Sequence, residues 1–217
     1  MKFHNAMATF RPAMQGRAGV ASILLASLAM LAGPASAYDV SAEAKLYNAT
    51  LNQVGKARLT QLGDGSVAVR ISVHDLTPGF HGFHVHAIGK CTIEEGVAPF
   101  TSAGGHFDIG GHTHGNHSGD FPVLLVHADG TANVKLNTDR FTLDALFDGD
   151  GSAIIIHANR DNYANIPDRY SAAGATAPGP DAATLGTGDS GGRAACGALE
   201  RIVKRDKGRS EDDDNDR

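Results

Sequence analysis

Hydrophobic and polar residues alternate over short distances along much of this chain, and helical periodicity is scarce. The segments 39–47, 56–62 and 66–76 alternate with the period of a strand that has one buried face. The segment 152–158, SAIIIHA, is β-branched and follows the turn sequence DGDG. Short strands bounded by Gly, Asp, Asn and Pro therefore predict an all-β protein.

Two turn sequences predict how these strands connect. Residues 63–65, GDG, separate the segments 56–62 and 66–76, which is a strong hairpin signal. The stretch 121–136 repeats the pattern around Asp129-Gly130. Many short antiparallel strands with close turns are typical of a β-sandwich or a barrel.

Two long stretches do not fit as strands. Residues 87–120 are rich in Gly and His, and residues 158–192 are rich in Gly, Ala, Asp and Pro. Loops of this length within a compact domain are usually functional or disordered. Because each stretch begins just after a histidine-bearing strand, we expect two long functional loops.

The first 37 residues predict a secretory signal peptide. Three basic residues precede the apolar run 19–33, and the small residues at 35–37 form an Ala-x-Ala cleavage site. The run is too short for a comfortable membrane span of about 20 residues, and an uncleaved anchor is the alternative. We expect cleavage near Ala37 and a periplasmic or secreted protein that begins at Tyr38, with no membrane span in its mature form.

Removal of residues 1–37 makes the chain more acidic. The segment carries three positive and no negative charges, so a net charge of −5 becomes −8, and Met7 or Met14 is an alternative start residue. An acidic exported protein is a poor candidate for binding nucleic acid. The remaining chain of roughly 180 residues is long enough for one well-buried core. We place one domain at 38–203, followed by a charged tail, 204–217, that we expect to be disordered.

The chain contains two cysteines, Cys91 and Cys196. In an exported protein an even pair predicts a disulfide, and two free buried thiols are the alternative. The bridge closes a loop of roughly 100 residues, which is worth about 4.7 kcal/mol in the chain-entropy model.

Histidines concentrate in the first long loop and at the ends of strands. His84 and His86 are two residues apart on one strand, so their rings leave from the same face and form a bidentate arm. His157 ends an apolar run, where an unpartnered ring is costly to bury. The loop adds further donors: His106, His112, His114, His117 and Asp120. These donors suffice for two metals, since imidazoles alone suit copper or zinc and mixed His/Asp sets suit zinc.

Several motifs, in this order, resemble those of the copper/zinc superoxide dismutases. They are GFHGFHVH (79–86), AGGHFD (103–108), HSGD (117–120) and GGRAACGAL (191–199). The segments 154–170 and 179–192 are similar to the bacterial secreted branch of the family. The resemblance covers residues 40 to 200 and implies a Greek-key β-sandwich, a flattened barrel of the immunoglobulin-like class.

The resemblance also implies a role for each site residue. The implied copper ligands are His84, His86, His106 and His157. The implied zinc ligands are His106, which bridges the two metals, and His114, His117 and Asp120. Asp161 is implied to link ligands of the two sites, Arg193 to draw the substrate toward copper, and His81 to be a structural hydrogen-bonding residue. Arg193 and His106 are thus the implied catalytic residues.

The zinc loop is shorter than in most members of the family. Three imidazoles, His112, His114 and His117, compete for two positions, and some bacterial members with a short loop do without zinc. His117 and Asp120 are present, which favours bound zinc, and His114 keeps the usual eight-residue separation from His106. We expect His114 to be the ligand, with His112 as the alternative.

The implied activity is the dismutation of superoxide anion to dioxygen and hydrogen peroxide, as antioxidant defence outside the cytoplasm. The alternatives are a non-enzymatic copper- or zinc-binding module of the same fold, or a structural β-sandwich with an incidental His-rich loop. Superoxide is the only expected partner besides copper and zinc ions, and the oligomeric state is left open between a monomer and a homodimer.

Overall fold

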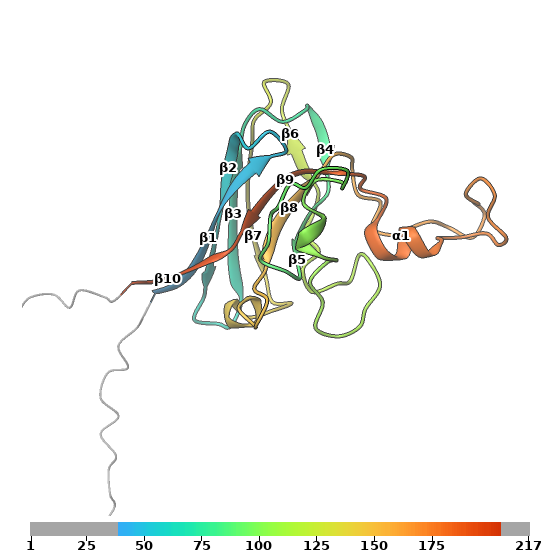
Figure 1. The fold of residues 1–217 in the computed structure, drawn as a ribbon. Helices are drawn as coiled ribbons and strands as arrows, with labels where there is room; N and C mark the ends of the chain where they lie inside the picture. Colours follow the sequence, from blue (N-terminus) through green and yellow to red (C-terminus); the bar gives the residue numbers. More distant parts are fainter. Residues whose placement is uncertain (1–38, 205–217) are drawn as a thin grey trace, which may run out of the picture. The chain divides into compact units, whose positions relative to one another are not determined.

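The computed structural model describes residues 39–204 of the chain, and the predicted all-β class is confirmed. One antiparallel sheet curls around the core in the strand order β5-β8-β9-β1-β2-β3-β7, with β10 paired to β1, and β4 and β6 form a separate small sheet (Figure 1). The strands are β1 (Asp39–Asn48), β2 (Gln53–Gln61), β3 (Val67–Val73), β4 (Gly79–His81), β5 (Phe83–His86), β6 (Leu124–Val126), β7 (Ala132–Thr138), β8 (Ala153–His157), β9 (Arg193–Ala198) and β10 (Glu200–Lys204).

The core lies on the concave side of the curled sheet. In β3, and in β2 from residue 55 to residue 59, every second residue is buried, as the alternating sequence predicts, and the side chains between them reach the opposite face. Leu143 and Leu146 of the short helix η2 (Leu143–Leu146) are fully buried in the same core. Fully buried aliphatic and aromatic side chains contribute about 1.5–3 kcal/mol each, so this core holds the sheet in its curled form.

The first predicted hairpin is present, and the second differs in its pairing. Residues 63–65 join β2 to β3, whose residues pair from Gly55↔Val73 to Gln61↔Val67. A turn also forms at Asp129-Gly130, closed by the hydrogen bond from His127 N–H to the Thr131 carbonyl. However, β6 pairs with β4 and β7 pairs with β3, so this turn carries the chain from the small sheet to the large one. A strong turn sequence therefore predicts the turn but not the partner of each strand.

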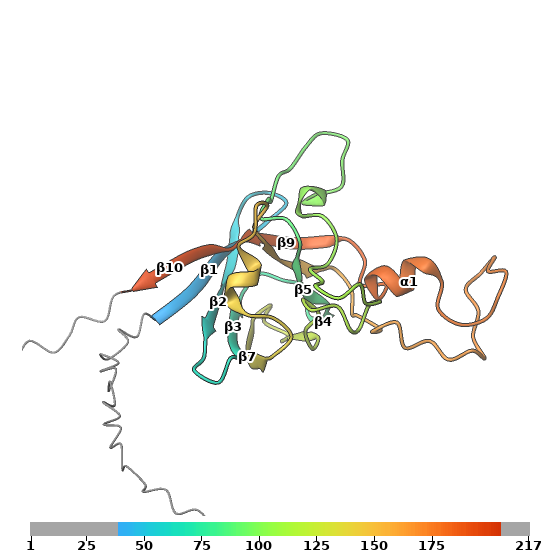
Figure 2. The same cartoon turned by 90° about the horizontal axis from the view of Figure 1, so that it is seen from below.

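Both long loops pack beside β5 and β8 and contain short helices that the sequence pattern does not reveal. These are η1 (Thr101–Ala103) in the first loop and α1 (Ala182–Thr187) in the second, seen beside the sheet in Figure 2. Asp181 caps α1, because its carboxylate accepts the Thr184 N–H. Gly188 ends the helix with a left-handed φ of 60°.

The predicted disulfide between Cys91 and Cys196 is present and ties the first long loop to β9. Cys196 is fully buried in a small second core with Phe100, Ala103 and Ile155, against which Cys91 packs. The loop is therefore fixed to the sheet covalently and by apolar contact, close to the residues at 103–106.

The predicted signal peptide, 1–37, lies outside the described residues, as does most of the predicted tail. Lys204, where we place the start of the tail, is the last residue of β10, so the strand extends one residue into it. Among residues 39–204 there is no helix with the length and apolar character to cross a membrane.

Candidate metal centre

Strand alternation places three histidines on one side of the sheet. In β5 and β8 the residues Phe83, Val85, Ile154 and Ile156 face the main core. The residues between them face the other way, which directs His84 and His86 of β5 and His157 of β8 toward the two long loops. The loops cover them, so their exposed fractions are only 0%, 1% and 4%.

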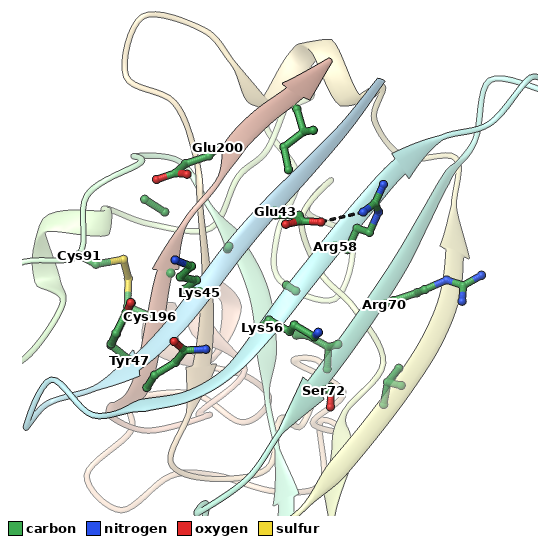
Figure 3. Close-up of a pocket in the computed structure, with 18 of the residues that line it drawn as sticks. Glu43, Lys45, Tyr47, Lys56, Arg58, Arg70, Ser72, Cys91, Cys196 and Glu200 are labelled. Carbon is green, nitrogen blue, oxygen red and sulfur yellow. Dashed lines mark hydrogen bonds and ion pairs between the residues drawn. A yellow bond between two sulfur atoms is a disulfide. The ribbon is translucent and has the colours of Figure 1, made fainter. Parts of the chain in front are cut away.

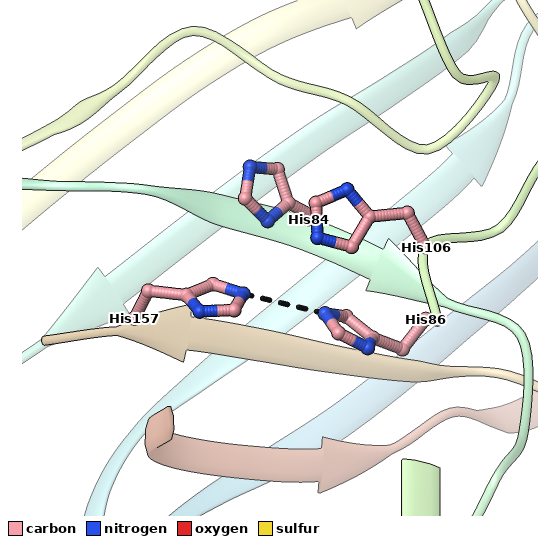
Figure 4. A group of neighbouring side chains, drawn as sticks. All are labelled: His84, His86, His106 and His157. Atoms are coloured by element: carbon pink, nitrogen blue, oxygen red, sulfur yellow. Dashed lines mark hydrogen bonds between the residues drawn. The ribbon is translucent and has the colours of Figure 1, made fainter. Parts of the chain in front are cut away.

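The first group of donors consists of these three histidines and His106 from the first loop (Figure 4). Each offers one ring nitrogen, and the four atoms lie within 4.8 Å of one another. The ring of His106 stacks on that of His84 with 4.1 Å between the centroids. Residue 106 is held there because it forms a β-bridge with residue 86.

Hydrogen bonding leaves unpaired ring nitrogens that point into this group. His86 Nδ1 lies 3.0 Å from the Gly104 carbonyl oxygen and His157 Nδ1 lies 3.1 Å from that of Gly191. A carbonyl only accepts, so both Nδ1 atoms donate, and the two Nε2 atoms, 3.3 Å apart, then both carry lone pairs. The Nε2–H group of His84 donates a hydrogen bond to the Asp161 carboxylate, and the buried Nδ1 of His84 has no partner. Three unpaired lone pairs in a buried space fit a bound cation.

Burial also keeps these rings in the form that binds metal. It lowers the pKa of His157 to about 3 and that of His106 to about 4, because the charged form loses its hydration. Burial is also the main cause of the lowered pKa of His86 and of His84. At neutral pH the four imidazoles are therefore neutral, as metal coordination requires.

A second group of donors adjoins the first and shares His106. His106 Nδ1 lies 3.0 Å from Asp120 Oδ1, 3.2 Å from His114 Nδ1 and 3.4 Å from His117 Nδ1. The compact set within 4.8 Å comprises His84, His106, His114 and Asp120. We place His84 in the first group only, because its Nε2 is engaged by Asp161, and His117 in the second, because its Nδ1 faces His106. His106 thus lies between the two groups, with one nitrogen toward each.

Carboxylates organise the second group. Asp120 Oδ2 accepts the N–H groups of Gly115 and His117, which holds the short loop around the carboxylate. Burial alone would raise the pKa of Asp120, but its contacts with His106 and His114 outweigh it and lower the pKa far below the usual range. Burial alone would lower the pKa of His114, yet its bonds to Asp120 and Asp161 raise that pKa to about 9.

Asp161 connects the two groups. Its Oδ2 lies 2.6 Å from His84 Nε2 and its Oδ1 lies 2.7 Å from His114 Nε2, and the side chain is fully buried. Each contact fixes the tautomer of one ring and turns its Nδ1 toward a donor group. Gly188 lies directly against this bridge, where a Cβ atom would overlap both Asp161 Oδ1 and His114 Nε2.

Three other residues singled out in the sequence, His112, His81 and Arg193, belong to neither donor group. His112 is exposed, bonded to Asp108 Oδ1 at 2.8 Å, and belongs to neither donor group. His81 is buried, with Nδ1 2.7 Å from the His157 carbonyl oxygen and Nε2 2.8 Å from that of Thr77. Arg193 donates to the carbonyl oxygens of Phe100 and Gly104.

Comparison with known proteins identifies the family. The family model described as copper/zinc superoxide dismutase (SODC) matches residues 53–199. The chain belongs to the copper/zinc superoxide dismutase family. A protein of Mycolicibacterium paratuberculosis named superoxide dismutase (Cu-Zn) is 43% identical over 176 residues, which is 77% of this chain and 77% of that protein.

Other family members extend the comparison. A Mycobacterium tuberculosis protein of the same name is 48% identical over 149 residues, or 64% of this chain. The match spans only 62% of that relative's own length. The solved structure of the Cu/Zn superoxide dismutase from Brucella abortus is 29% identical, with a TM-score of 0.54, and the match covers 74% of this chain and 99% of that one. The fold described above is therefore shared with a solved member of the family.

Three residues that hydrogen-bond beside the two donor groups carry no signal in the sequence pattern. Arg140 donates to the carbonyl oxygens of Gly115 and His117 at 3.4 and 3.1 Å, so its guanidinium holds the backbone of the short loop.

Tyr163 and Asp108 are the other two. Tyr163 donates its N–H to Asp161, and its hydroxyl oxygen accepts the Val123 N–H at 2.7 Å. Asp108 accepts the Ser118 N–H as well as bonding to His112. Such contacts join distant segments, so only the fold reveals them.

Proposed function

We propose that this protein dismutates superoxide anion to dioxygen and hydrogen peroxide. The observation that carries the proposal is the shared imidazole of His106, which lies between an all-histidine donor group and a His/Asp group. All-imidazole sites suit copper, and mixed His/Asp sites suit zinc. Family membership supports the same activity.

We assign copper to His84, His86, His106 and His157, and zinc to His106, His114, His117 and Asp120. Bound copper would exchange one electron with each of two superoxide anions, and bound zinc would fix the bridging imidazole. The unpaired Nδ1 of His84 and the facing Nε2 atoms of His86 and His157 support the copper assignment. His114 is preferred over His112 because it contacts His106, whereas His112 is exposed.

The chain's own residues supply orientation, charge and a proton. Asp161 and Asp120 hold the rings of both groups in fixed tautomers. The Arg193 guanidinium is held by two carbonyl oxygens and lies close enough to His86 and His157 to contribute to lowering their pKa values. It therefore provides a fixed positive charge that attracts a small anion to this place. The Nε2 atom of His106 can carry one of the two protons that peroxide formation consumes.

Export of the protein is part of the proposal. The Cys91–Cys196 disulfide supports an oxidising compartment outside the cytoplasm, and residues 1–37 have the sequence pattern of a cleaved signal peptide. Amino-terminal sequencing of the exported protein is expected to begin at Tyr38. A start before residue 19 on exported protein would contradict cleavage.

The direct test measures metal content and superoxide consumption on the same preparation. Protein loaded with copper and zinc is expected to bind one ion of each per chain and to remove superoxide at a rate that is lost on chelation of copper. Copper-loaded protein that leaves superoxide unchanged would refute the enzyme and favour a metal-binding module. The matched control is Arg193→Lys, which keeps the positive charge but not the two-carbonyl anchorage, and should lower the rate while copper remains bound.

A further inference from the structure

A second site-like feature lies on the outer face of the sheet, away from the donor groups. It is a groove of about 1000 Å³ that runs over β10, β1, β2, β3 and β7 and ends at the Cys91–Cys196 disulfide (Figure 3). Side chains that alternate with the buried core residues line it, among them Lys45 of β1 and Lys56 of β2. We call it the outer groove.

Strand register arranges the charges of the outer groove in rows. One row crosses four strands in the order Glu43, Arg58, Arg70 and Lys135, because these residues are direct partners in the β1–β2, β2–β3 and β3–β7 ladders. In the next row Lys45 pairs directly with Lys56. The register therefore brings three pairs of cations face to face: Lys45–Lys56, Arg58–Arg70 and Arg70–Lys135.

Such pairs need a compensating negative charge. Like charges directly opposite each other on neighbouring strands are destabilising. Glu43 compensates Arg58 through an ion pair of 2.7 Å. Four further cations, Lys45, Lys56, Arg70 and Lys135, are exposed and form no ion pair with any residue in the described range 39–204. The groove thus has an excess of positive charge in a protein that is acidic overall.

We propose that the outer groove binds the acidic segment 211–217 of the same chain. This segment, EDDDNDR, carries five carboxylates and one arginine, which complements the four cations. It lies outside the described residues, but residues 205–210 join it to β10, whose residues Glu200 and Ile202 line the groove. The proposed occupant is therefore covalently connected to a strand at the edge of the outer groove.

The length of the intervening chain allows this docking. In the β1–β10 ladder Lys204 pairs with Asp39, so Lys45 lies six residues further along β1, about 20 Å away at 3.3 Å per residue. Six residues, 205–210, separate Lys204 from Glu211, and the seven Cα–Cα steps between them span at most about 25 Å when extended. Gly208 lies between them and permits the chain to reverse. The carboxylates at 211–216 therefore reach from Lys45 across to Lys135, three strand spacings of about 4.8 Å away.

Covalent connection favours this occupant over a separate polyanion or a second copy. A short flexible link gives the attached segment an effective concentration in the millimolar range. Individual exposed ion pairs are weak. A free acidic polymer would therefore compete for the same cations only at a concentration comparable to this effective concentration. We expect the docked segment to shield the groove from other anions at low salt and to leave it at high salt.

A carbodiimide cross-linking experiment locates the segment. Purified protein at 50 mM salt is expected to form amide links between the carboxylates at 211–216 and Lys45, Lys56 or Lys135, within one chain. A mixture of isotopically light and heavy protein separates links within a chain from links between copies. Links that join only differently labelled copies would assign the groove to a second copy, and the absence of links to these three lysines would refute docking.

A double-mutant cycle measures the coupling. Replacement of Asp212, Asp213 and Asp214 by Asn is expected to lower Tm by about 2–4 °C at low salt in the natural background. In a Lys56→Gln/Arg70→Gln background the same replacement should lower Tm by no more than half as much, because two of the four partner cations are absent. The control background, Arg160→Gln/Arg169→Gln, removes two cations from the loop 158–192 and should retain the full loss. Equal losses in all three backgrounds would overturn the proposal.

Discussion

The two donor groups of the metal centre are built by different means. The first takes three of its four histidines from β5 and β8, where antiparallel pairing and the core beneath fix the direction of each side chain. The second takes its remaining donors, His114, His117 and Asp120, from an irregular loop. There the geometry depends on hydrogen bonds that Asp120 and Asp161 accept and that Arg140 donates. The first group is therefore preorganised by the sheet, while the second is preorganised only as well as its supporting contacts allow.

This contrast predicts where the chain tolerates change. Removal of a histidine of β5 or β8 should abolish binding of one metal ion. The fold should stay intact, because the sheet that carries the histidine remains rigid. Loss of a supporting residue should weaken the loop group first, because nothing else fixes its backbone. The experiments below separate these outcomes.

The largest effect is expected from His157→Ala. It removes one of the two facing Nε2 atoms in the first group. Copper affinity should fall by more than about 100-fold, since even a partner in the outer shell is worth 10–100-fold, and superoxide consumption should fall with it. Metal titration and an activity assay measure both, with His127→Ala as the control, since His127 is exposed on a turn. Full activity in His157→Ala would remove this residue from the copper site.

Asp161→Asn tests the bridge between the groups. Each ring uses a different oxygen of Asp161, and in Asn one of these atoms becomes an NH2 donor that faces a ring N–H, so at least one ring is released. We expect zinc affinity to fall about 10–100-fold, with a smaller loss for copper. Gly188→Ala is a second variant for the same test, because its Cβ atom displaces the bridge without changing the carboxylate. Equal losses of copper and zinc would show that the strands do not hold their group independently.

In metal-free protein the two groups should respond to pH in opposite directions. The folded pKa of His157, about 3, lies below the unfolded value near 6.5, so the unfolded chain binds more protons and stability falls as pH decreases from 6.5. The folded pKa of His114, about 9, lies above the unfolded value, so its stabilising contribution is lost as pH rises from 6.5 through 9. Each contribution is on the order of 2–3 kcal/mol.

Denaturant unfolding between pH 4 and 9.5 in the presence of a chelator measures these two limbs. His157→Gln should make the acid limb less steep, with the rest of the slope coming from His84, His86 and His106, whose pKa values are also lowered. His114→Gln should flatten the alkaline limb. The carboxylates of Asp120 and Asp161, whose pKa values are lowered, lose their stabilising contribution only as pH falls toward the unfolded value of 3.8, so they add little to the acid limb above pH 5. A stability curve that does not change shape in either variant would contradict the assignment of the limbs.

The sequence predicts the strand-borne half of the site better than the loop-borne half, and the reason is geometric. Spacing of two residues on a strand fixes the relative direction of His84 and His86, so a local pattern suffices. The loop has no such periodicity, so the choice between His112 and His114 depended on resemblance to relatives. The exposure of His112 and its bond to Asp108 become visible only in the folded chain.

Pairing between distant segments accounts for what the sequence leaves out. The turn at Asp129-Gly130 is predictable from its residues, but β6 and β7 join different sheets because their partners, β4 and β3, lie elsewhere in the chain. Arg140 supports residues 115 and 117 only because the curled sheet brings the end of β7 beside the first loop. Side-chain contacts of this kind carry no periodic signal.

Arg140→Gln is expected to have a smaller effect than Asp161→Asn and to act on zinc alone. It removes the bonds to the carbonyl oxygens of Gly115 and His117, so the loop loses part of its preorganisation. Zinc affinity should fall by about 3–10-fold, equivalent to about one hydrogen bond, with copper affinity unchanged. Arg140→Lys keeps a donor and should recover part of the loss. A matching loss of copper would mean that the loop supports both groups equally.

The smallest effect is expected from His112→Ala, although His112 and His114 are two residues apart in the same loop. His112 is exposed and bonded to Asp108, whose carboxylate keeps its bonds to Ser118 when the imidazole is removed. Zinc stoichiometry should stay unchanged in His112→Ala and fall in His114→Ala, because only the second variant removes a nitrogen facing His106. The reverse result would move the ligand to His112 and require the loop to rearrange around bound zinc. The pair therefore tests whether the loop-borne group is already in place before the metal arrives, as the strand-borne group is.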